Sequence, residues 1–194
     1  MSDPFNINQI FRSVALAILL IVFSDQGIRA DDKPLRHHPR WLHGFRIGIL
    51  AHDVPMWSRS RAEGGVDLNA EVIFNYPDCS LLSGKMRSNL GASLNSQGDT
   101  STLYSGLLWE YNRHSRFFVN LGLGLAVHDG ELEPRYDDKK ALGSRILFRV
   151  PVEVGLRLAK HHGVSILFVH VSNAYLAESN EGLDTIGLRY SYRF

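Results

Sequence analysis

The sequence predicts an all-β protein, an eight-stranded antiparallel transmembrane β-barrel that is preceded by a cleaved signal peptide. Three observations lead to this prediction. A short apolar run stands near the N-terminus, apolar residues then recur at every second position, and the last such run ends on Phe194. We therefore expect a signal peptide over residues 1–30, a periplasmic lead-in over 31–42 and an outer-membrane barrel over 43–194.

The N-terminal segment has the layout of an export signal. Arg12 precedes an apolar run at residues 14–23, and a polar stretch then leads to Ala30. The run is shorter than the roughly twenty residues that a spanning helix needs, so we expect cleavage near Ala30. A retained anchor helix is the alternative, because Ile28 fits a small-x-small cleavage site poorly. Residues 31–42 are charged and contain two prolines, which favours a lead-in outside the sheet.

Eight runs with the period of a β-strand follow. In each run apolar side chains alternate with small or polar ones, as expected where one face meets lipid and the other meets a lumen. The runs lie near residues 45–52, 66–74, 89–95, 102–111, 117–128, 145–157, 164–172 and 184–194. The terminal run, IGLRYSYRF, resembles the C-terminal signal that the outer-membrane barrel assembly machinery recognises.

The polar face of these runs is expected to line the lumen. The sixth run alone places four charges there, at Arg145, Arg149, Glu153 and Arg157, a density that a soluble sandwich would not bury in its core. We expect the arginines to pair with carboxylates, namely Asp67, Glu71, Glu110 and Glu153. Side chains fill the lumen of a barrel of about eight strands, so solute transport is disfavoured.

Composition excludes several function classes. The formal net charge is +1, and no basic run of the kind that binds nucleic acid is present. Cys79 is the only cysteine, so an intramolecular disulfide or a cysteine-based zinc site cannot form. Of the nine histidines, the clustered ones, His37, His38, His43, His161 and His162, lie beside basic segments without a carboxylate at ligand spacing, and we expect neither a metal nor a cofactor.

Three residues that suit hydrolytic chemistry gather at one end of the predicted barrel. With an even number of strands both termini lie on the periplasmic side, so His170, Ser172 and Asp184 fall at the exterior end. His170 and Ser172 are two residues apart and share a face, and Asp184 has the parity of the outward residues of the last run. Together they could supply a nucleophile, a base and an orienting acid.

The residues alone leave two questions open. One concerns the face of the seventh run, where Leu167 and Val169 are as apolar as Ile166 and Phe168. The other concerns the role of the residues, because a rim histidine bonded to loop groups and an aspartate at a turn are common structural features.

A resemblance to a known family favours the catalytic interpretation. His170-Val171-Ser172-Asn173-Ala174, followed by Asn-Glu-Gly-Leu-Asp at residues 180–184, resembles the signature of the PagL family of lipid A 3-O-deacylases, and residues 142–145 (Leu-Gly-Ser-Arg) are similar to another segment of it. The resemblance implies an enzyme of the Gram-negative cell outer membrane that removes the 3-position acyl chain from lipid A of lipopolysaccharide, without a cofactor. It assigns Ser172 as nucleophile, His170 as base, Asp184 as acid and Asn173 to the oxyanion hole.

The sequence departs from the family pattern at two positions. The acid is usually glutamate and is Asp184 here, and Tyr175 stands where glycine is common. Because aspartate has the shorter reach, we expect Asp184→Glu to keep or raise activity. A phospholipase-type esterase on the same scaffold is one alternative function, and a non-catalytic structural or adhesin barrel is another.

Overall fold

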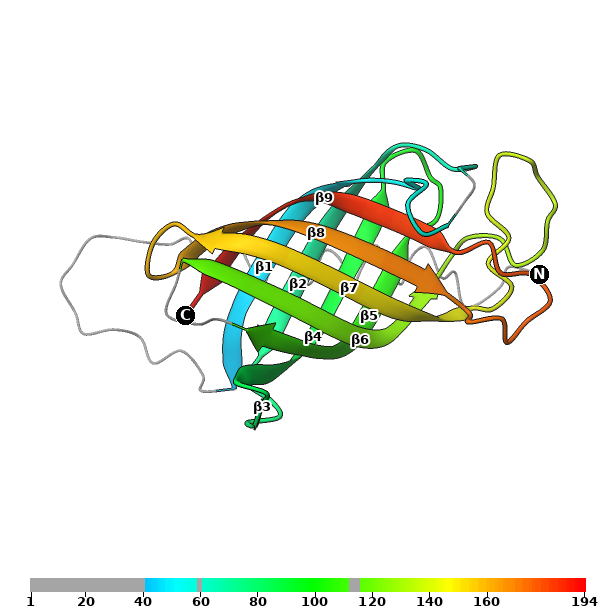
Figure 1. The fold of residues 1–194 in the computed structure, drawn as a ribbon. Coiled ribbons are helices and arrows are strands. Elements are labelled where there is room, and N and C mark those ends of the chain that lie inside the picture. Colours follow the sequence, from blue (N-terminus) through cyan, green and yellow to red (C-terminus); the bar gives the residue numbers. More distant parts are fainter. Residues whose placement is uncertain (1–40, 59–60, 112–115) are drawn as a thin grey trace, which may run out of the picture.

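The structure is a computed structural model that describes residues 41–58, 61–111 and 116–194. The expected signal peptide and nearly all of the expected lead-in lie outside the described residues, so both remain predictions. The described chain forms one sheet of nine antiparallel strands (Figure 1). They are β1 (Leu42–Ala51), β2 (Val66–Phe74), β3 (Ser80–Leu81), β4 (Gly84–Asn95), β5 (Thr102–Tyr111), β6 (Phe117–His128), β7 (Ile146–Arg157), β8 (His162–Ser172) and β9 (Leu183–Arg193).

Eight long strands close into a barrel, which confirms the predicted fold class. The strand order is β2-β1-β9-β8-β7-β6-β5-β4-β3, and pairing of β2 with β4 closes the sheet on itself. The two-residue β3 pairs with the start of β4, so that β4 begins at Gly84, earlier than the alternation in the sequence indicated. Among the described residues, no helix is long and apolar enough to span a membrane.

The two ends of the barrel differ in their connections. At one end Phe194 donates its backbone N–H to the carbonyl of His43 at 3.0 Å, so the C-terminus lies beside the start of β1. The connections after β1, β4, β6 and β8 leave from the opposite end (Figure 1), and three of them, at residues 52–65, 129–145 and 173–182, are the longest connections between the long strands. We call this opposite end the long-loop end.

The alternation of the sequence becomes an outer and an inner face. Outward side chains in the middle of the strands are strongly exposed, as at Leu68 (60%), Leu123 (64%) and Leu188 (69%). Such a continuous apolar exterior is what a barrel presents to lipid tails.

Ion pairs fill the middle of the lumen, and Glu71 and Glu153 are among the carboxylates predicted for them, but the arginines are Arg46 and Arg189 and not those of the sixth run, of which Arg149 lies over the Tyr104 ring, 3.7 Å from its centroid. Arg46 Nη1 lies 3.2 Å from Glu71 and 3.1 Å from Glu153, and Arg189 Nη2 lies 2.8 Å from Glu71. Each of these four side chains is nearly inaccessible to solvent, and pairing offsets the large cost of burying a charge.

Two of the predicted lumen charges have other partners. Asp67 accepts a hydrogen bond from His52 Nδ1 at 2.8 Å and is not paired with an arginine, because it lies at the mouth of the barrel where β1 ends. Arg145 precedes β7 and lies outside the lumen, where Nη1 donates to the carbonyl of Gly130 at 2.7 Å. Loop groups at the rim therefore satisfy charges that parity alone assigned to the lumen.

An apolar core occupies the lumen toward the long-loop end, and it resolves the face of β8. Leu167, Val169 and Val171 point inward and are buried there. They pack with a cluster from other strands and one loop, Leu50, Tyr104, Ala126, Leu142, Leu147 and Leu183. His170 and Ser172 therefore lie on the outer face, beside the apolar exterior.

Candidate active site

His170 and Asp184 lie directly opposite each other on β8 and β9. Asp184 Oδ1 and His170 Nδ1 are 2.6 Å apart. A carboxylate can only accept a hydrogen bond, so the Nδ1 atom carries the hydrogen and Nε2 is left as the basic nitrogen. The pair therefore has the orientation that an acid and a general base adopt in a catalytic triad.

Ser172 follows His170 by two residues on the same face of β8, where it pairs with Phe148 of β7. Side chains at such positions stand roughly 6.6 Å apart along a strand, within reach of each other through side-chain rotation. Both side chains are half-buried. The structure thus brings together the three residues that the sequence selected, on the lipid-facing side of the long-loop end.

Asp184 has further partners that the sequence did not reveal. Its Oδ2 atom accepts hydrogen bonds from the backbone N–H of Trp57 at 2.5 Å, the backbone N–H of Ser58 at 2.6 Å and the Ser58 hydroxyl at 3.0 Å. The carboxylate is completely buried (0% exposed). Its position on the outward face is tolerated because the loop between β1 and β2 covers it and supplies donors.

The chain turns sharply directly after Ser172. Ala174 and Tyr175 both have positive φ angles, 55° and 62°. Asn173 is buried, and its amide group donates to the carbonyls of Leu142 at 2.8 Å and Ser179 at 2.5 Å. Asn173 therefore holds the loop after β8 against the loop before β7. The Tyr175 side chain is 86% exposed and projects away from the protein.

Close contacts favour glycine at two positions, Gly143 in the segment 142–145 and Gly182 in the segment 180–184. Gly182 has φ +65°, and a Cβ atom there would lie 3.1 Å from His170 Cε1. Gly143 has φ +73°, and a Cβ atom would lie 1.9 Å from the carbonyl oxygen of Ser179. Both positions favour glycine because other residues rarely adopt this backbone conformation. The loops can pack onto His170 and Asn173 only with these residues in place.

Within the described part of the chain, no group of three or more histidine, cysteine, aspartate or glutamate side chains could hold a metal ion. The acidic and histidine side chains at the long-loop end are instead hydrogen-bonded to each other and to backbone amides.

Comparison with known proteins gives concordant matches. The family model described as lipid A 3-O-deacylase (PagL) matches residues 49–193. A protein of Bordetella bronchiseptica named lipid A deacylase PagL is 32% identical over 79 residues, which cover 41% of this chain and 42% of that protein. The protein of the same name from Pseudomonas aeruginosa is 33% identical over 73 residues, covering 38% of this chain and 40% of that protein. The aligned part thus spans less than half the length of these relatives.

A solved structure also matches the barrel. The crystal structure of the outer membrane enzyme PagL covers 77% of this chain and 99% of its own, with a TM-score of 0.58 and 20% sequence identity. At this identity the match shows the shared fold.

Proposed function

The chain belongs to the lipid A 3-O-deacylase (PagL) family, and on that premise we propose that it hydrolyses the ester-linked acyl chain at the 3 position of lipid A. The observation that carries the proposal is the contact between His170 and Asp184, with Ser172 on the same outward face. Lipid A forms the outer leaflet of the outer membrane, so a site on the lipid-facing side of the long-loop end meets this substrate directly. A soluble substrate would not require the site to face lipid.

The proposed mechanism uses Ser172 as the nucleophile. Its Oγ atom attacks the ester carbonyl carbon while His170 Nε2 takes the hydroxyl proton, and Asp184 stabilises the imidazolium that forms. The bond between the carbonyl carbon and the sugar oxygen breaks, the sugar oxygen receives the proton from His170 and leaves as a hydroxyl group, and the acyl chain remains on Ser172. Water then attacks the acyl-enzyme with His170 again as base, which releases the fatty acid and restores the serine.

Asn173 is proposed to serve the oxyanion hole, where donors stabilise the charge on the ester oxygen. Its amide hydrogens are used on two carbonyl groups. In the proposal, the amide must release the carbonyl of Leu142 or Ser179 when substrate binds in order to donate directly. Asn173 also fixes the turn that begins after Ser172, where its own backbone N–H donates to Asn180 Oδ1 at 3.0 Å.

The partners follow from the same proposal. The substrate is lipid A of lipopolysaccharide, the location is the cell outer membrane, and no cofactor takes part in the reaction. Phe194 directly follows the C-terminal strand β9 and packs against it, with the ring centroids of Tyr192 and Phe194 5.5 Å apart. We include recognition of this strand by the barrel assembly machinery in the proposal.

The proposal is tested with purified protein folded in detergent micelles and assayed on purified lipid A. We expect wild type to release a 3-position acyl chain and both Ser172→Ala and His170→Asn to release none, because the first lacks the nucleophile and the second the base. Ser80→Ala, an exposed serine in β3, is the matched control and should retain full activity. Release of fatty acid from phospholipid vesicles, with lipid A left intact, would replace the proposed substrate. No hydrolysis of either lipid would identify a non-catalytic barrel.

A further inference from the structure

A short segment of the β1–β2 loop holds the catalytic acid in place. We call residues 54–58 the acid-binding segment. Val54 donates its backbone N–H to the carbonyl of Asp184 at 2.9 Å, and Trp57 and Ser58 together donate three hydrogen bonds to Asp184 Oδ2. The other carboxylate oxygen is thereby left for His170.

The same segment also contacts the base. The Trp57 ring stacks on the His170 ring, with centroids 4.6 Å apart and an interplanar angle of 23°. A parallel aromatic ring restricts rotation of the imidazole and covers one of its faces. Gly182 packs against the edge of the imidazole, because a Cβ atom at Gly182 would lie 3.1 Å from His170 Cε1. His170 is therefore confined by Asp184, Trp57 and Gly182.

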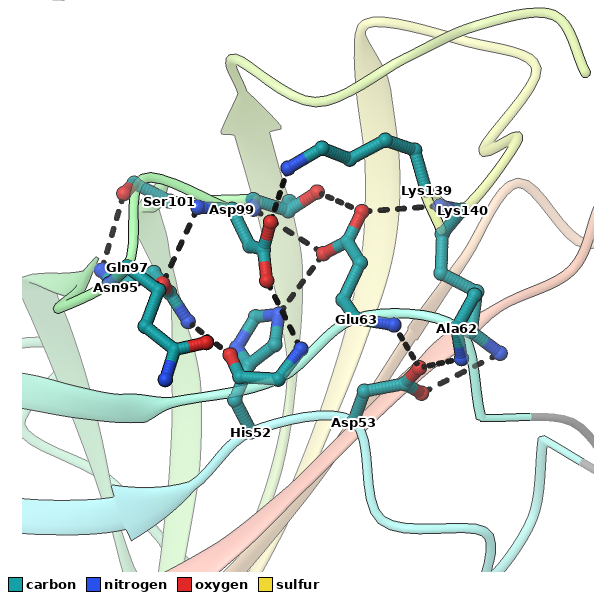
Figure 2. A network of polar contacts seen from close by, with 12 residues as sticks. His52, Asp53, Ala62, Glu63, Asn95, Gln97, Asp99, Ser101, Lys139 and Lys140 are labelled. Carbon is teal, nitrogen blue, oxygen red and sulfur yellow. Dashed lines mark hydrogen bonds and ion pairs between the residues drawn. The ribbon is translucent and has the colours of Figure 1, made fainter. Parts of the chain in front are cut away.

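Buried ion pairs anchor the residues on both sides of the acid-binding segment (Figure 2). Asp53, which directly precedes it, lies 3.3 Å from Lys140 Nζ, and both side chains are completely buried. Asp53 Oδ2 also accepts the backbone N–H groups of Ala62 and Glu63, at 2.7 and 3.0 Å. These contacts tie the β1–β2 loop to the loop between β6 and β7.

Glu63 extends this anchor to two further elements. Its carboxylate accepts hydrogen bonds from His52 Nε2 at 2.9 Å, from the Thr100 hydroxyl at 2.9 Å and from the Lys140 backbone at 3.0 Å. Figure 2 shows Glu63 of the β1–β2 loop beside Asp99 of the β4–β5 loop and Lys140 of the β6–β7 loop. The acid-binding segment is therefore mounted on a network that spans the long-loop end of the barrel.

We propose that Trp57 and Ser58 are positioning residues of this enzyme, which seat Asp184 and His170 for proton transfer from Ser172. This inference rests on the proposed hydrolytic function and adds a fourth element to it, the acid-binding segment. The side chain of aspartate is one methylene group shorter than that of glutamate, so its carboxylate reaches less far toward the base. Three donors on Oδ2 fix the short carboxylate from behind at the distance where Oδ1 meets His170.

The proposal is tested by the rate at which an alkyl fluorophosphonate labels Ser172 in the folded full-length protein. In this reaction the serine oxygen bonds to phosphorus, fluoride leaves and the hydroxyl proton goes to His170, so the rate reports activation of the serine whatever the natural substrate is. Ser58→Ala should reduce the rate about tenfold, the effect of losing one charge-assisted hydrogen bond. Ser58→Thr keeps the hydroxyl and should restore most of the rate.

Trp57→Ala should reduce the labelling rate by about tenfold to a hundredfold, the range seen when a catalytic group is misplaced by about 1 Å. Trp57→Phe should recover part of the rate because it retains a ring on His170. Trp41, at 59% exposure, is as exposed as Trp57 at 61%, but it lies at the opposite end of the barrel. Trp41→Ala is therefore the matched control and should label like wild type.

A double variant separates positioning from a general effect on folding. Ser58→Ala should have no further effect on labelling when Asp184 is already alanine, because its action passes through that carboxylate. Equal fold-losses in both backgrounds would overturn the proposal, as would wild-type labelling of both Ser58→Ala and Trp57→Ala. If wild type labels at Ser172 but leaves lipid A intact, the proposed substrate is wrong and the variants still decide the positioning role. Failure of wild type to label would overturn both proposals.

Discussion

Lengthening the proposed catalytic acid is the most informative single substitution. Asp184 is completely buried, and both of its oxygens already have partners, at 2.6 Å on the side of His170 and at 2.5, 2.6 and 3.0 Å on the side of Trp57 and Ser58. The methylene that Asp184→Glu adds, about 1.5 Å long, has no free space between these two sets of contacts. The geometry thus reverses the expectation from the sequence that glutamate would keep or raise activity.

The expected loss follows from the cost of overpacking. An extra methylene in a filled site costs about 1–3 kcal/mol, and each 1.36 kcal/mol is a factor of ten in rate. If displacing His170 or the acid-binding segment carries this cost, deacylation by Asp184→Glu should fall about 5- to 150-fold. Asp184→Ala sets the lower limit of the deacylation rate, because an orienting acid contributes up to about 10⁴-fold to the rate.

The assay is the initial rate of acyl release from lipid A by protein that has folded, as judged by heat-modifiable mobility on a gel. A shift in folded fraction alone would lower the amount of active protein and leave the rate per folded molecule unchanged. A rate per folded Asp184→Glu molecule equal to or above that of wild type would refute the fixed position that we assign to the carboxylate.

Other parts of the site and the barrel give three more predictions. Gly182→Ala should lower deacylation at least tenfold, because its positive φ and its contact with His170 both oppose a side chain; wild-type rates would contradict the packing. Burial alone would lower the pKa of His52. The hydrogen bonds and negative charges of Asp67 and Glu63 outweigh this effect and raise the pKa from 6.5 to about 9. Protonated His52 therefore stabilises the folded state fully below pH 6.5, and this contribution is lost as the pH rises through about 9. Limited proteolysis of the loops should increase over that range in wild type, and His52→Gln should lack this step. Leu123→Arg, in the outward face of β6, should lower the free energy of unfolding by about 2–4 kcal/mol, the cost of a cation near the bilayer midplane; denaturant titration in lipid vesicles measures it.

The barrel was predictable because a strand between lipid and a charged lumen has a strict period of two. β6 shows this most clearly, with Leu121, Leu123 and Leu125 outward and glycine, asparagine or alanine inward. β8 was ambiguous because the lumen beside it is apolar, so that Leu167 and Val169 face inward while Ile166 faces lipid. Alternation loses its information wherever both faces of a strand are apolar.

The sequence alone could not predict which residues contact the proposed triad. Trp57 and Ser58 come from a loop without periodicity, and they contact Asp184, which lies more than a hundred residues away along the chain. His52 and Lys140 are also rim residues, and each contacts a carboxylate of another element: His52 contacts Asp67 of β2, and Lys140 contacts Asp53 of the β1–β2 loop. Spacing identifies His170 and Ser172 because they share one strand, but contacts between loops depend on how the closed barrel arranges them.

The most direct test of the proposed function is a mass spectrum of lipid A from Gram-negative cells that express the protein. Cells with wild type should contain lipid A that lacks one 3-hydroxyacyl group, and cells with folded Ser172→Ala in the outer membrane should contain the complete form. Complete lipid A in cells where folded wild type is present in the outer membrane would contradict the proposal, and new lysophospholipids in those cells would identify a phospholipase instead.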